Sequence, residues 1–311
     1  MSHTSTTRNR WAEELESRAR AHWTQARTDE LLQGKKVLIR PGDAAPLLRA
    51  LGLLNADASL PPAQVRKYFQ INHMVGVLGP AFAELRSRHE RIRLLDAGCG
   101  RSYLTLLLAW CGEHVWRHRI EVLGVDRNAD VIDECRRRTE IAALAHVARF
   151  EVGDLAAIPA VATDAIHGVI ALHACDSATC DAIALGVSRK AELVAVAPCC
   201  QAELARGWEA LADRGTVADD GNAGLAPIWR TPHLRRETAA HVTDAMRMLL
   251  LRAAGYEVAA IEFIGAEHTK KNTLIRAMRR IDGDDAARRE YEALVRATGG
   301  IGLRLRDRLW A

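Results

Sequence analysis

The chain has 311 residues, of which 49% are hydrophobic and 26% are charged. These proportions are typical of a globular protein with a sizeable core, and they exclude a disordered, collagen-like or simple coiled-coil chain. The formal net charge of +4 is a surplus that permits a nucleic-acid partner without requiring one.

The sequence predicts a cytoplasmic protein. No apolar run approaches the roughly 20 residues that cross a bilayer, so we expect no membrane span. The first ten residues are polar and have no apolar core of an export signal. The seven cysteines are odd in number and lack the regular spacing of a secreted disulfide scaffold, which fits a reducing compartment.

Residues 1–90 are predicted to form a helical appendage. Apolar residues recur at helical spacing over 9–33, and Gly34 follows. Further helices are expected over Ala44–Leu54 and Ala63–Arg88.

From residue 91 the pattern changes to short apolar runs separated by helical or loop sequence, which is typical of parallel βαβ units. The expected strands are Arg93–Asp96, Glu121–Val125, Ala148–Val152, Gly168–Leu172, Glu192–Ala197, Glu257–Ile264 and Thr273–Arg279. The last two are close enough to pair as an antiparallel hairpin. We therefore predict an α/β domain over 91–280, with five parallel strands, a terminal hairpin and a helical insert at 201–254. Residues 281–311 are predicted to be a C-terminal helical extension.

The first predicted strand ends in an acidic residue followed by a glycine loop. Asp96 precedes Gly98 and Gly100, and a leucine-rich helix begins shortly afterwards. Glycines let the backbone approach a ligand closely, and the amides at the helix start face that ligand. Tyr103 stands where a dinucleotide fingerprint would have its third glycine, which disfavours pyrophosphate. A carboxylate at Asp96 suits a cationic ligand instead.

Acidic residues also follow the next two strands. Asp126 is placed where a carboxylate can bind both hydroxyls of a ribose, and Asp154 where it can accept from the exocyclic amine of adenine. Taken singly, Asp126 also fits a helix N-cap, Gly98 and Gly100 a tight turn, and Asp154 an ordinary acidic residue of a loop. Their order at successive strand ends favours cofactor binding.

This ordered set, with the final hairpin, resembles the class I S-adenosylmethionine-dependent methyltransferases over about 190 residues. The resemblance implies a Rossmann-like seven-stranded methyltransferase sheet and S-adenosylmethionine as cofactor. It also implies that the glycine loop supports the methionyl part, the second acid the ribose and the third acid the adenine. The implied cofactor-binding residues are Asp96, Gly98, Gly100, Ser102, Asp126, Arg127, Asp154, Leu155 and His173.

Chemically active side chains gather after the fourth and fifth strands, where ligands of parallel sheets bind. The loop between the last two strands is expected over the same edge. The candidate catalytic residues are His173, Cys175, Asp176, Cys199, Cys200, His268 and Asn272.

Two of these segments resemble a narrower family. It includes the tRNA position-four 2′-O-methyltransferases and the methyltransferase domain of the glutathione-S-transferase-C-terminal-domain protein. The resemblance lies in the histidine and cysteine segment after strand four and in Pro198-Cys199-Cys200. In the tRNA 2′-O-methyltransferases the two cysteines are followed by histidine, whereas this chain has Gln201. The N-terminal zinc-finger cysteines of those enzymes have no counterpart here, because the first cysteine of this chain is Cys99.

Three chemistries fit these residues. In direct transfer, His173, Asp176 or His268 orients or deprotonates a nucleophile behind the methyl group. In cysteine-assisted transfer, a thiolate of Cys175, Cys199 or Cys200 adds to a pyrimidine ring. In the third, Cys175, Cys180, Cys199, Cys200 and His173 supply ligands to zinc. We favour direct transfer and expect no metal. Cys99, Cys111 and Cys135 are expected to be small core residues.

The preferred substrate is RNA. Basic residues concentrate at 230–236, with Trp229 and His233 among them, and at 276–280; arginines interleaved with aromatic rings can bind phosphates and stack bases. Solvated arginines of a helix entrance are the alternative. Methyl transfer to a small metabolite or a protein side chain is the catalytic rival, and a cofactor-binding scaffold is the non-catalytic one.

Overall fold

A computed structural model of the chain describes residues 3–155, 165–172, 177–199, 201–214, 225–262 and 273–310, with side chains from residue 10 onward. The chain divides into two compact units, Met1–Thr163 and Asp164–Ala311. Each unit is described by itself below.

The first unit begins with helices α1 (His3–His22), α2 (Gln25–Leu32), α3 (Ala45–Ala50) and α4 (Pro62–Arg88). The prediction of one helix over 9–33 is wrong, because the helix ends at His22. Thr24 then caps the next helix, its hydroxyl accepting from the amide of Arg27 at 3.4 Å. A side-chain oxygen at this position satisfies an amide that helix geometry leaves open. The helix predicted over Ala44–Leu54 is shorter than expected.

Helix α4 holds the segment before α3 in place through a buried amide. The side-chain oxygen of Asn72 accepts from the backbone amides of Leu38 and Ile39 at 3.1 and 2.8 Å. The hydroxyl of Tyr68, which is fully buried, donates to the carbonyl of Ile39 at 2.8 Å. Buried polar groups are stable only when paired in this way, so this helix face is a structural one.

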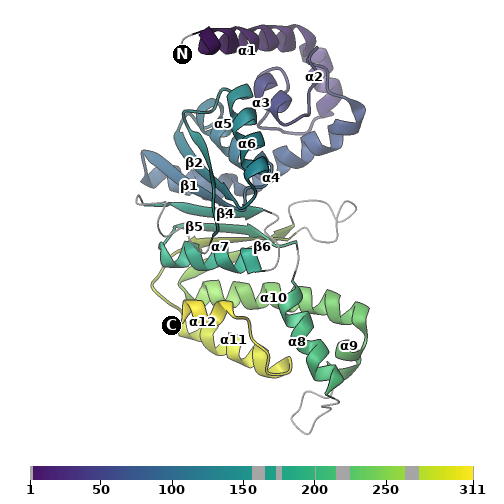
Figure 1. Cartoon of the computed structure of the whole chain (residues 1–311), viewed down its shortest axis with the longest axis vertical. Coiled ribbons are helices and arrows are strands. Elements are labelled where there is room, and N and C mark those ends of the chain that lie inside the picture. The colour runs from purple at the N-terminus through teal and green to yellow at the C-terminus, as the bar shows by residue number, and fades with distance from the viewer. Residues whose placement is uncertain are drawn as a thin grey trace. The chain divides into compact units, whose positions relative to one another are not determined.

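Three parallel strands form the sheet of the first unit. They are β1 (Arg91–Ala97), β2 (Arg119–Asp126) and β3 (Ala148–Val152), with β2 in the middle. Asp96 lies opposite Gly124, and Asp126 opposite Val152. Helices α5 (Tyr103–His114) and α6 (Ala129–Ile141) pack on β2 (Figure 1). The carboxyl ends of the strands therefore carry the acidic residues that the sequence singled out.

The second unit contains the other four strands. β4 (Gly168–Leu172) runs parallel to β5 (Leu193–Ala197), β5 is antiparallel to β7 (Thr273–Arg279), and β7 is antiparallel to β6 (Tyr256–Glu262). The described strands thus comprise five that pair in parallel and a terminal antiparallel pair, which confirms the predicted Rossmann-like methyltransferase fold. Residues 263–272, between the last two strands, lie outside the described residues.

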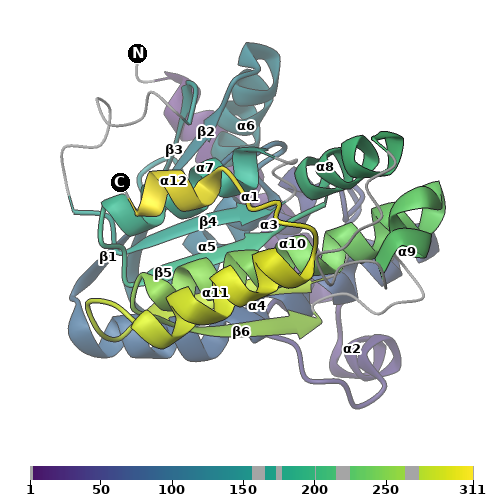
Figure 2. The ribbon, with the colours of Figure 1, turned by 90° about the horizontal axis from the view of Figure 1, so that it is seen from below.

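Helices pack around these strands. They are α7 (Ser177–Ser188), α8 (Ala202–Asp213), α9 (Ala226–Arg230), α10 (Pro232–Ala253), α11 (Asp285–Ala297) and α12 (Leu305–Leu309). Figure 2 shows α11 lying along α10, which also contacts β6. The predicted insert at 201–254 contains α8, the short helix α9 and α10. The C-terminal extension is two helices, because Gly299 and Gly300 adopt φ of 96° and 77° between them, a conformation that ends a helix.

Within the described ranges, no helix combines the length and the apolar character needed to cross a membrane.

Candidate active site

The loop after β1 has the backbone conformation that requires glycine. Gly98 and Gly100 have φ of 72° and 50°, in the left-handed region that side chains disfavour. The amides of Gly98 and Cys99 both donate to the carbonyl of Val125, at 2.9 and 3.0 Å, which fastens the loop to β2. Apart from the neighbouring residues of the chain, no atom of the described residues lies within 4 Å of the point where a Cβ of Gly100 would stand. The loop is therefore rigid, with open space on one side.

Asp126 binds this loop through its carboxylate. Its Oδ2 accepts from the amide of Gly100 and its Oδ1 from the amide of Asn128, both at 3.0 Å. Each carboxylate oxygen can accept a second hydrogen bond, and the side chain is half-buried rather than enclosed. Two directed acceptors thus remain for a ligand with a pair of hydroxyls.

Asp96 is enclosed beneath the loop, with 2% of its surface exposed. The hydroxyl of Thr105 on α5 donates to its Oδ2. Burial, reinforced by the nearby carboxylate of Asp126, raises the pKa of Asp96 to about 7 despite that hydrogen bond. No cationic side chain among the described residues pairs with it. The site is therefore set to favour a positively charged ligand.

The other predicted cofactor residues have different surroundings. Arg127 Nη2 and Asp154 Oδ1 form an ion pair at 2.9 Å, with 70% and 45% of the side chains exposed. Ser102 and Leu155 are buried, and Ser102 begins α5 with a φ of 59°. Asp154 is thus partly neutralised by its neighbour, while Ser102 belongs to the interior of the loop.

The packing beneath the loop explains why residue 124 is a glycine and where the thiols of Cys99 and Cys135 lie. A Cβ on Gly124 would stand 3.1 Å from the Sγ of Cys99 and 2.6 Å from the ring of Phe150, and the second distance is shorter than real Cβ atoms show. Cys135 donates to the carbonyl of Gly100 at 3.0 Å. Cys99, Cys111 and Cys135 are all buried, which confirms that they are core residues.

The N-terminal helices reach the start of α5. Lys67 on α4 donates to the hydroxyl of Tyr103 at 2.6 Å, and its Nζ also lies 3.9 Å from the centre of the ring. The same hydroxyl donates to the carbonyl of Leu51 at 3.1 Å. Tyr103, in place of a third glycine, therefore ties the cofactor loop to the appendage.

In the second unit, a buried polar network supports the turn after β5. Gln201 Nε2 donates to Asp244 Oδ1 and Oδ2 at 3.3 and 3.0 Å. Asp244 pairs with Arg247, which is 1% exposed, at 3.1 Å. Arg247 also donates to the Sγ of Cys180 at 3.5 Å. Gln201, which stands where the narrower family has histidine, therefore points to α10 and anchors the turn.

One of the predicted catalytic residues lies within the described part of the chain. It is Cys199, which is half-buried at the end of β5. The others lie outside the described residues; they are His173, Cys175, Asp176, Cys200, His268 and Asn272. Their catalytic roles stay predictions. Among the described residues, no group of three or more histidine, cysteine or acidic side chains could hold a metal ion.

The structure changes the interpretation of the basic segment at 230–236. Trp229 is 4% exposed and Arg235 is 9% exposed. Arg235 donates to the carbonyl of Trp229 at 2.7 Å and pairs with Glu209. A buried ring cannot stack on a base, so the prediction of interleaved stacking is wrong for these two residues. Arg230, His233 and Arg236 are exposed.

Comparison with known proteins identifies the class of domain. Residues 66–207 match a family model described as a methyltransferase domain, and no curated protein sequence matches. The match spans the glycine loop, the acids after β2 and β3, and the turn after β5. Together with the strand order, it confirms that the chain carries a class I methyltransferase domain that uses S-adenosylmethionine. The narrower resemblance to the tRNA-modifying family stays a prediction.

Solved structures resemble the chain only distantly. A cofactor-bound protein from MTB, Rv0187, has 18% identity and a TM-score of 0.46, covering 82% of this chain and 96% of that one. The S-adenosylhomocysteine-bound methyltransferase PaMTH1 from Podospora anserina has 10% identity and a TM-score of 0.44, covering 83% and 95%. An rRNA methylase from Streptococcus thermophilus has 10% identity and a TM-score of 0.39, and the match covers 70% of this chain and 97% of that one. Likenesses this low carry no argument about activity or substrate.

The residues of the first unit suit this cofactor. Asp96 lacks a cationic partner within the described part of the chain, Asp126 has acceptors to spare, and the loop is open at Gly100. Sequence reasoning missed Thr105 and the Asp244–Arg247 pair. Thr105 is the polar residue in the apolar run 104–110, and that interruption was the available signal.

Proposed function

We propose that this methyltransferase acts on RNA, transferring the methyl group directly to a nitrogen or oxygen atom. When bound, S-adenosylmethionine would supply a methyl group carried on a positively charged sulfur, and the electron pair of the carbon–sulfur bond would stay on that sulfur as a lone pair of the nucleophile takes the methyl group. The proton of the nucleophile passes to a base, for which His173, Asp176 and His268 are the candidates.

We further propose that the residues of the first unit hold the cofactor. Asp126 would accept from the ribose hydroxyls, and the loop at Gly98 and Gly100 would lie against the methionyl part. Asp96 would favour the positive charge through its field, because it is buried and hydrogen-bonded to Thr105. Asp154 is the candidate for the adenine amine.

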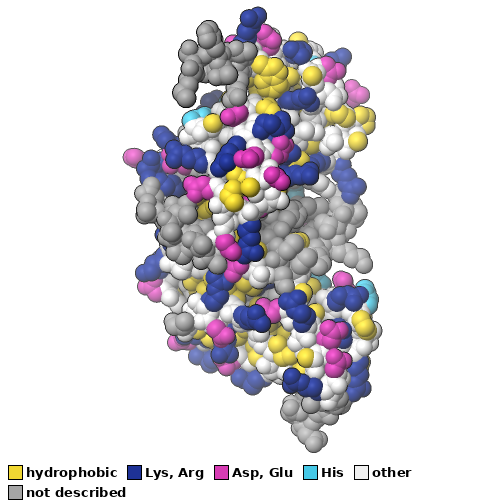
Figure 3. Space-filling model, viewed as in Figure 1, with side chains coloured by type: hydrophobic (Ala, Val, Ile, Leu, Met, Phe, Trp, Pro, Cys, Tyr) yellow, Lys and Arg dark blue, Asp and Glu magenta, His cyan; other side chains and the backbone are white. Residues whose placement is uncertain are grey.

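The RNA substrate rests on one observation above the others. Arg230 and Arg236, at the junction of α9 and α10, are exposed and have no ion-pair partner among the described residues. Phosphate contacts dominate the affinity of proteins for nucleic acids. Figure 3 shows basic and acidic side chains intermixed over the drawn face, so an RNA contact would depend on such particular arginines rather than on a broad basic patch.

Direct transfer is preferred to a covalent mechanism because it requires no thiolate nucleophile. Of the thiols that a covalent mechanism could use, Cys199 is half-buried beside the end of β5, and Cys175 and Cys200 lie outside the described residues.

The proposal is tested by following labelled methyl groups. Purified protein is incubated with methyl-labelled S-adenosylmethionine and, separately, with deproteinised RNA, RNA-free protein extract and a small-molecule extract. We expect label in RNA, and nucleoside analysis by mass spectrometry then identifies the methylated atom. Label in protein or in the small-molecule fraction would replace RNA by the rival substrates. Label in no fraction, with cofactor binding intact, would favour the scaffold.

A further inference from the structure

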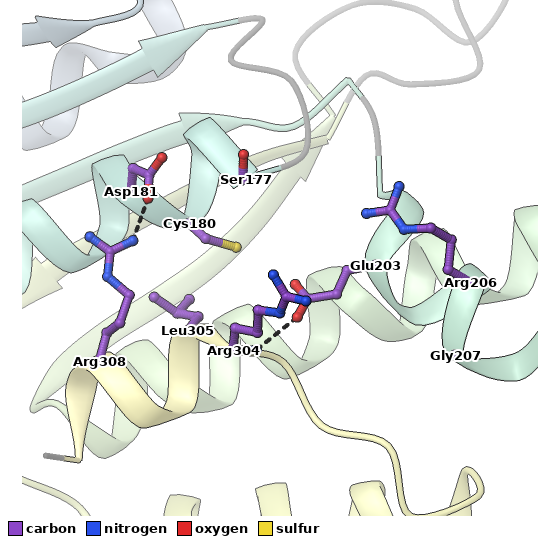
Figure 4. Close-up of a pocket in the computed structure, with 9 residues that line it drawn as sticks. All are labelled: Ser177, Cys180, Asp181, Glu203, Arg206, Gly207, Arg304, Leu305 and Arg308. Carbon is purple, nitrogen blue, oxygen red and sulfur yellow. Dashed lines mark hydrogen bonds and ion pairs between the residues drawn. The ribbon is translucent and has the colours of Figure 1, made fainter. Parts of the chain in front are cut away.

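A pocket of about 540 Å³ lies entirely within the second unit. It is lined by Ser177, Cys180, Asp181, Glu203, Arg206, Gly207, Arg304, Leu305 and Arg308. The residues come from α7, which begins just after β4, from α8, which begins just after β5, and from the C-terminal segment that contains Arg304 and α12 (Figure 4). The pocket therefore lies beside the first turns of the two helices that follow the carboxyl ends of β4 and β5, and ligands of such sheets bind at these ends.

The wall formed by the C-terminal segment 298–305 is fixed at several points. Trp208 on α8 donates to the carbonyl of Thr298 at 2.7 Å, and the amide of Leu303 donates to the hydroxyl of Tyr291 at 2.9 Å. A Cβ on Gly207 would stand 2.8 Å from the side chain of Ile301, so α8 and this segment are in close contact. The wall is therefore preorganised, which reduces the entropic cost of binding a ligand.

Arg308, Asp181 and Glu203 are among the charged groups of the pocket that already have partners. Arg308 pairs with Asp181, and Glu203 accepts from the backbone amide of Arg304 at 2.8 Å. The guanidinium of Arg304 itself has no hydrogen-bond or ion-pair partner among the described residues. Arg206, one turn along α8 from Glu203, is exposed at the same pocket.

The chemistry of this lining favours an anion. Three guanidinium groups face two carboxylates, which leaves a positive excess. Guanidinium groups match the oxygens of phosphate in a planar, forked arrangement. A phosphate group fits these features because it offers several acceptor oxygens to arginines on two walls.

We propose that this pocket binds a phosphate group of the substrate, with Arg304 and Arg206 as its ligands. The inference rests on the proposed RNA function and adds to it a site on the second unit for a phosphate of the RNA backbone. The same chemistry would accept the phosphate of a free nucleotide, and the experiment below separates the two sources.

The test compares Arg304→Ala with Arg296→Ala. Both variants remove one positive charge from the second unit. Arg296, however, lies on α11, where 71% of its side chain is exposed and its Nη1 is 4.0 Å from Glu292 Oε2. Binding of a fluorescein-labelled hairpin RNA is measured by anisotropy over a range of salt concentrations. We expect Arg304→Ala to weaken binding about tenfold and to reduce the salt slope by about one. We expect Arg296→Ala to match the wild type. Unchanged cofactor affinity and circular dichroism show that both variants are folded.

A second arm uses adenosine monophosphate and inorganic phosphate, with thermal stabilisation of the protein as the readout. One outcome is that these ligands stabilise the wild type but not Arg304→Ala, while the wild type neither binds nor methylates RNA. This outcome would support the pocket and assign it to a free nucleotide. The proposed RNA function would then fail alone. Equal behaviour of Arg304→Ala and Arg296→Ala in both arms would overturn the phosphate site, while RNA methylation by the wild type would leave the proposed function standing.

Discussion

Asp96 in the first unit and Asp244 in the second are both carboxylates held inside the protein, and burial raises the pKa of each. Their partners differ. Asp244 has the guanidinium of Arg247 and the amide of Gln201, whereas Asp96 has the hydroxyl of Thr105. A charge compensated by the chain itself serves the fold, while a buried carboxylate without a cation of its own can gain from a cationic ligand. The contrast separates a structural network from a binding site.

The largest effect on stability is expected when Asp244 loses its cationic partner. Arg247→Ala would leave Asp244 buried without its cation, and we expect the free energy of unfolding to fall by about 3 to 5 kcal/mol. Urea unfolding measures this change. The control is Arg296→Ala, which alters an exposed residue and should stay within about 0.5 kcal/mol of the wild type.

Replacing both members of the pair sharpens this test. Asp244→Leu combined with Arg247→Met removes the two charges together, and we expect most of the lost stability to return. A single variant as stable as the wild type would show that Asp244 does not depend on Arg247.

Asp126→Ala is expected to have the next largest effect, on cofactor binding. The change removes the proposed ribose acceptor and also the oxygens that hold the amides of Gly100 and Asn128. We expect a loss of about 1 to 3 kcal/mol of binding free energy, measured by calorimetry with S-adenosylhomocysteine. Asp130→Ala, an exposed acid in the first turn of α6, is the matched control. Equal affinities of the two variants would refute the placement of Asp126.

Asp96→Asn tests the carboxylate that lacks a cation. The amide can still accept from Thr105 but carries no charge, so we expect S-adenosylmethionine to bind about tenfold more weakly. At pH 8 the same variant should unfold at a higher urea concentration than the wild type, because a buried charge has been removed. Weaker binding together with lower stability would instead indicate a structural role.

The pH dependence follows from the raised pKa of Asp96. Between its ordinary value near 4 and about 7, the folded protein holds a proton that the unfolded chain has lost. This contribution to stability therefore falls as pH rises through that range. A bound cation favours the carboxylate, so cofactor affinity should rise from pH 6 to pH 8. Asp96→Asn should lose this dependence, and a wild type with a flat profile would contradict the assignment.

The smallest effect is expected at the end of β5. Cys199→Ser and Cys200→Ser should each leave turnover within about twofold of the wild type if transfer is direct. The measurement is the initial rate of methyl incorporation at saturating cofactor. Abolished turnover with retained cofactor affinity would support a thiolate mechanism.

Local patterns predicted much of the first unit. The acids at the strand ends and the glycines between them are close in sequence, and their backbone requirements are stereochemical. The prediction of one helix over 9–33 failed because apolar spacing continues across Thr24, which caps the next helix. Trp229 was misjudged because sequence does not show which face of a short helix is covered.

Contacts between distant segments were not predictable. Gln201 and Asp244 are 43 residues apart, and Glu203 and Arg304 are 101 apart. Such pairs arise only when packing brings helices together, and a single sequence contains no periodic signal for them. The anchoring role of Gln201 and the arginine-lined pocket therefore required the structure.

The contacts of Tyr103 bear on how the protein can be shortened. Its hydroxyl bonds to Lys67 and to the carbonyl of Leu51, both of which precede β1. A fragment starting at Arg91 would strip both partners from the first residue of α5, directly after the glycine loop. Truncation at that boundary would therefore disturb cofactor recognition as well as remove helices, and a minimal catalytic fragment has to retain α3 and α4.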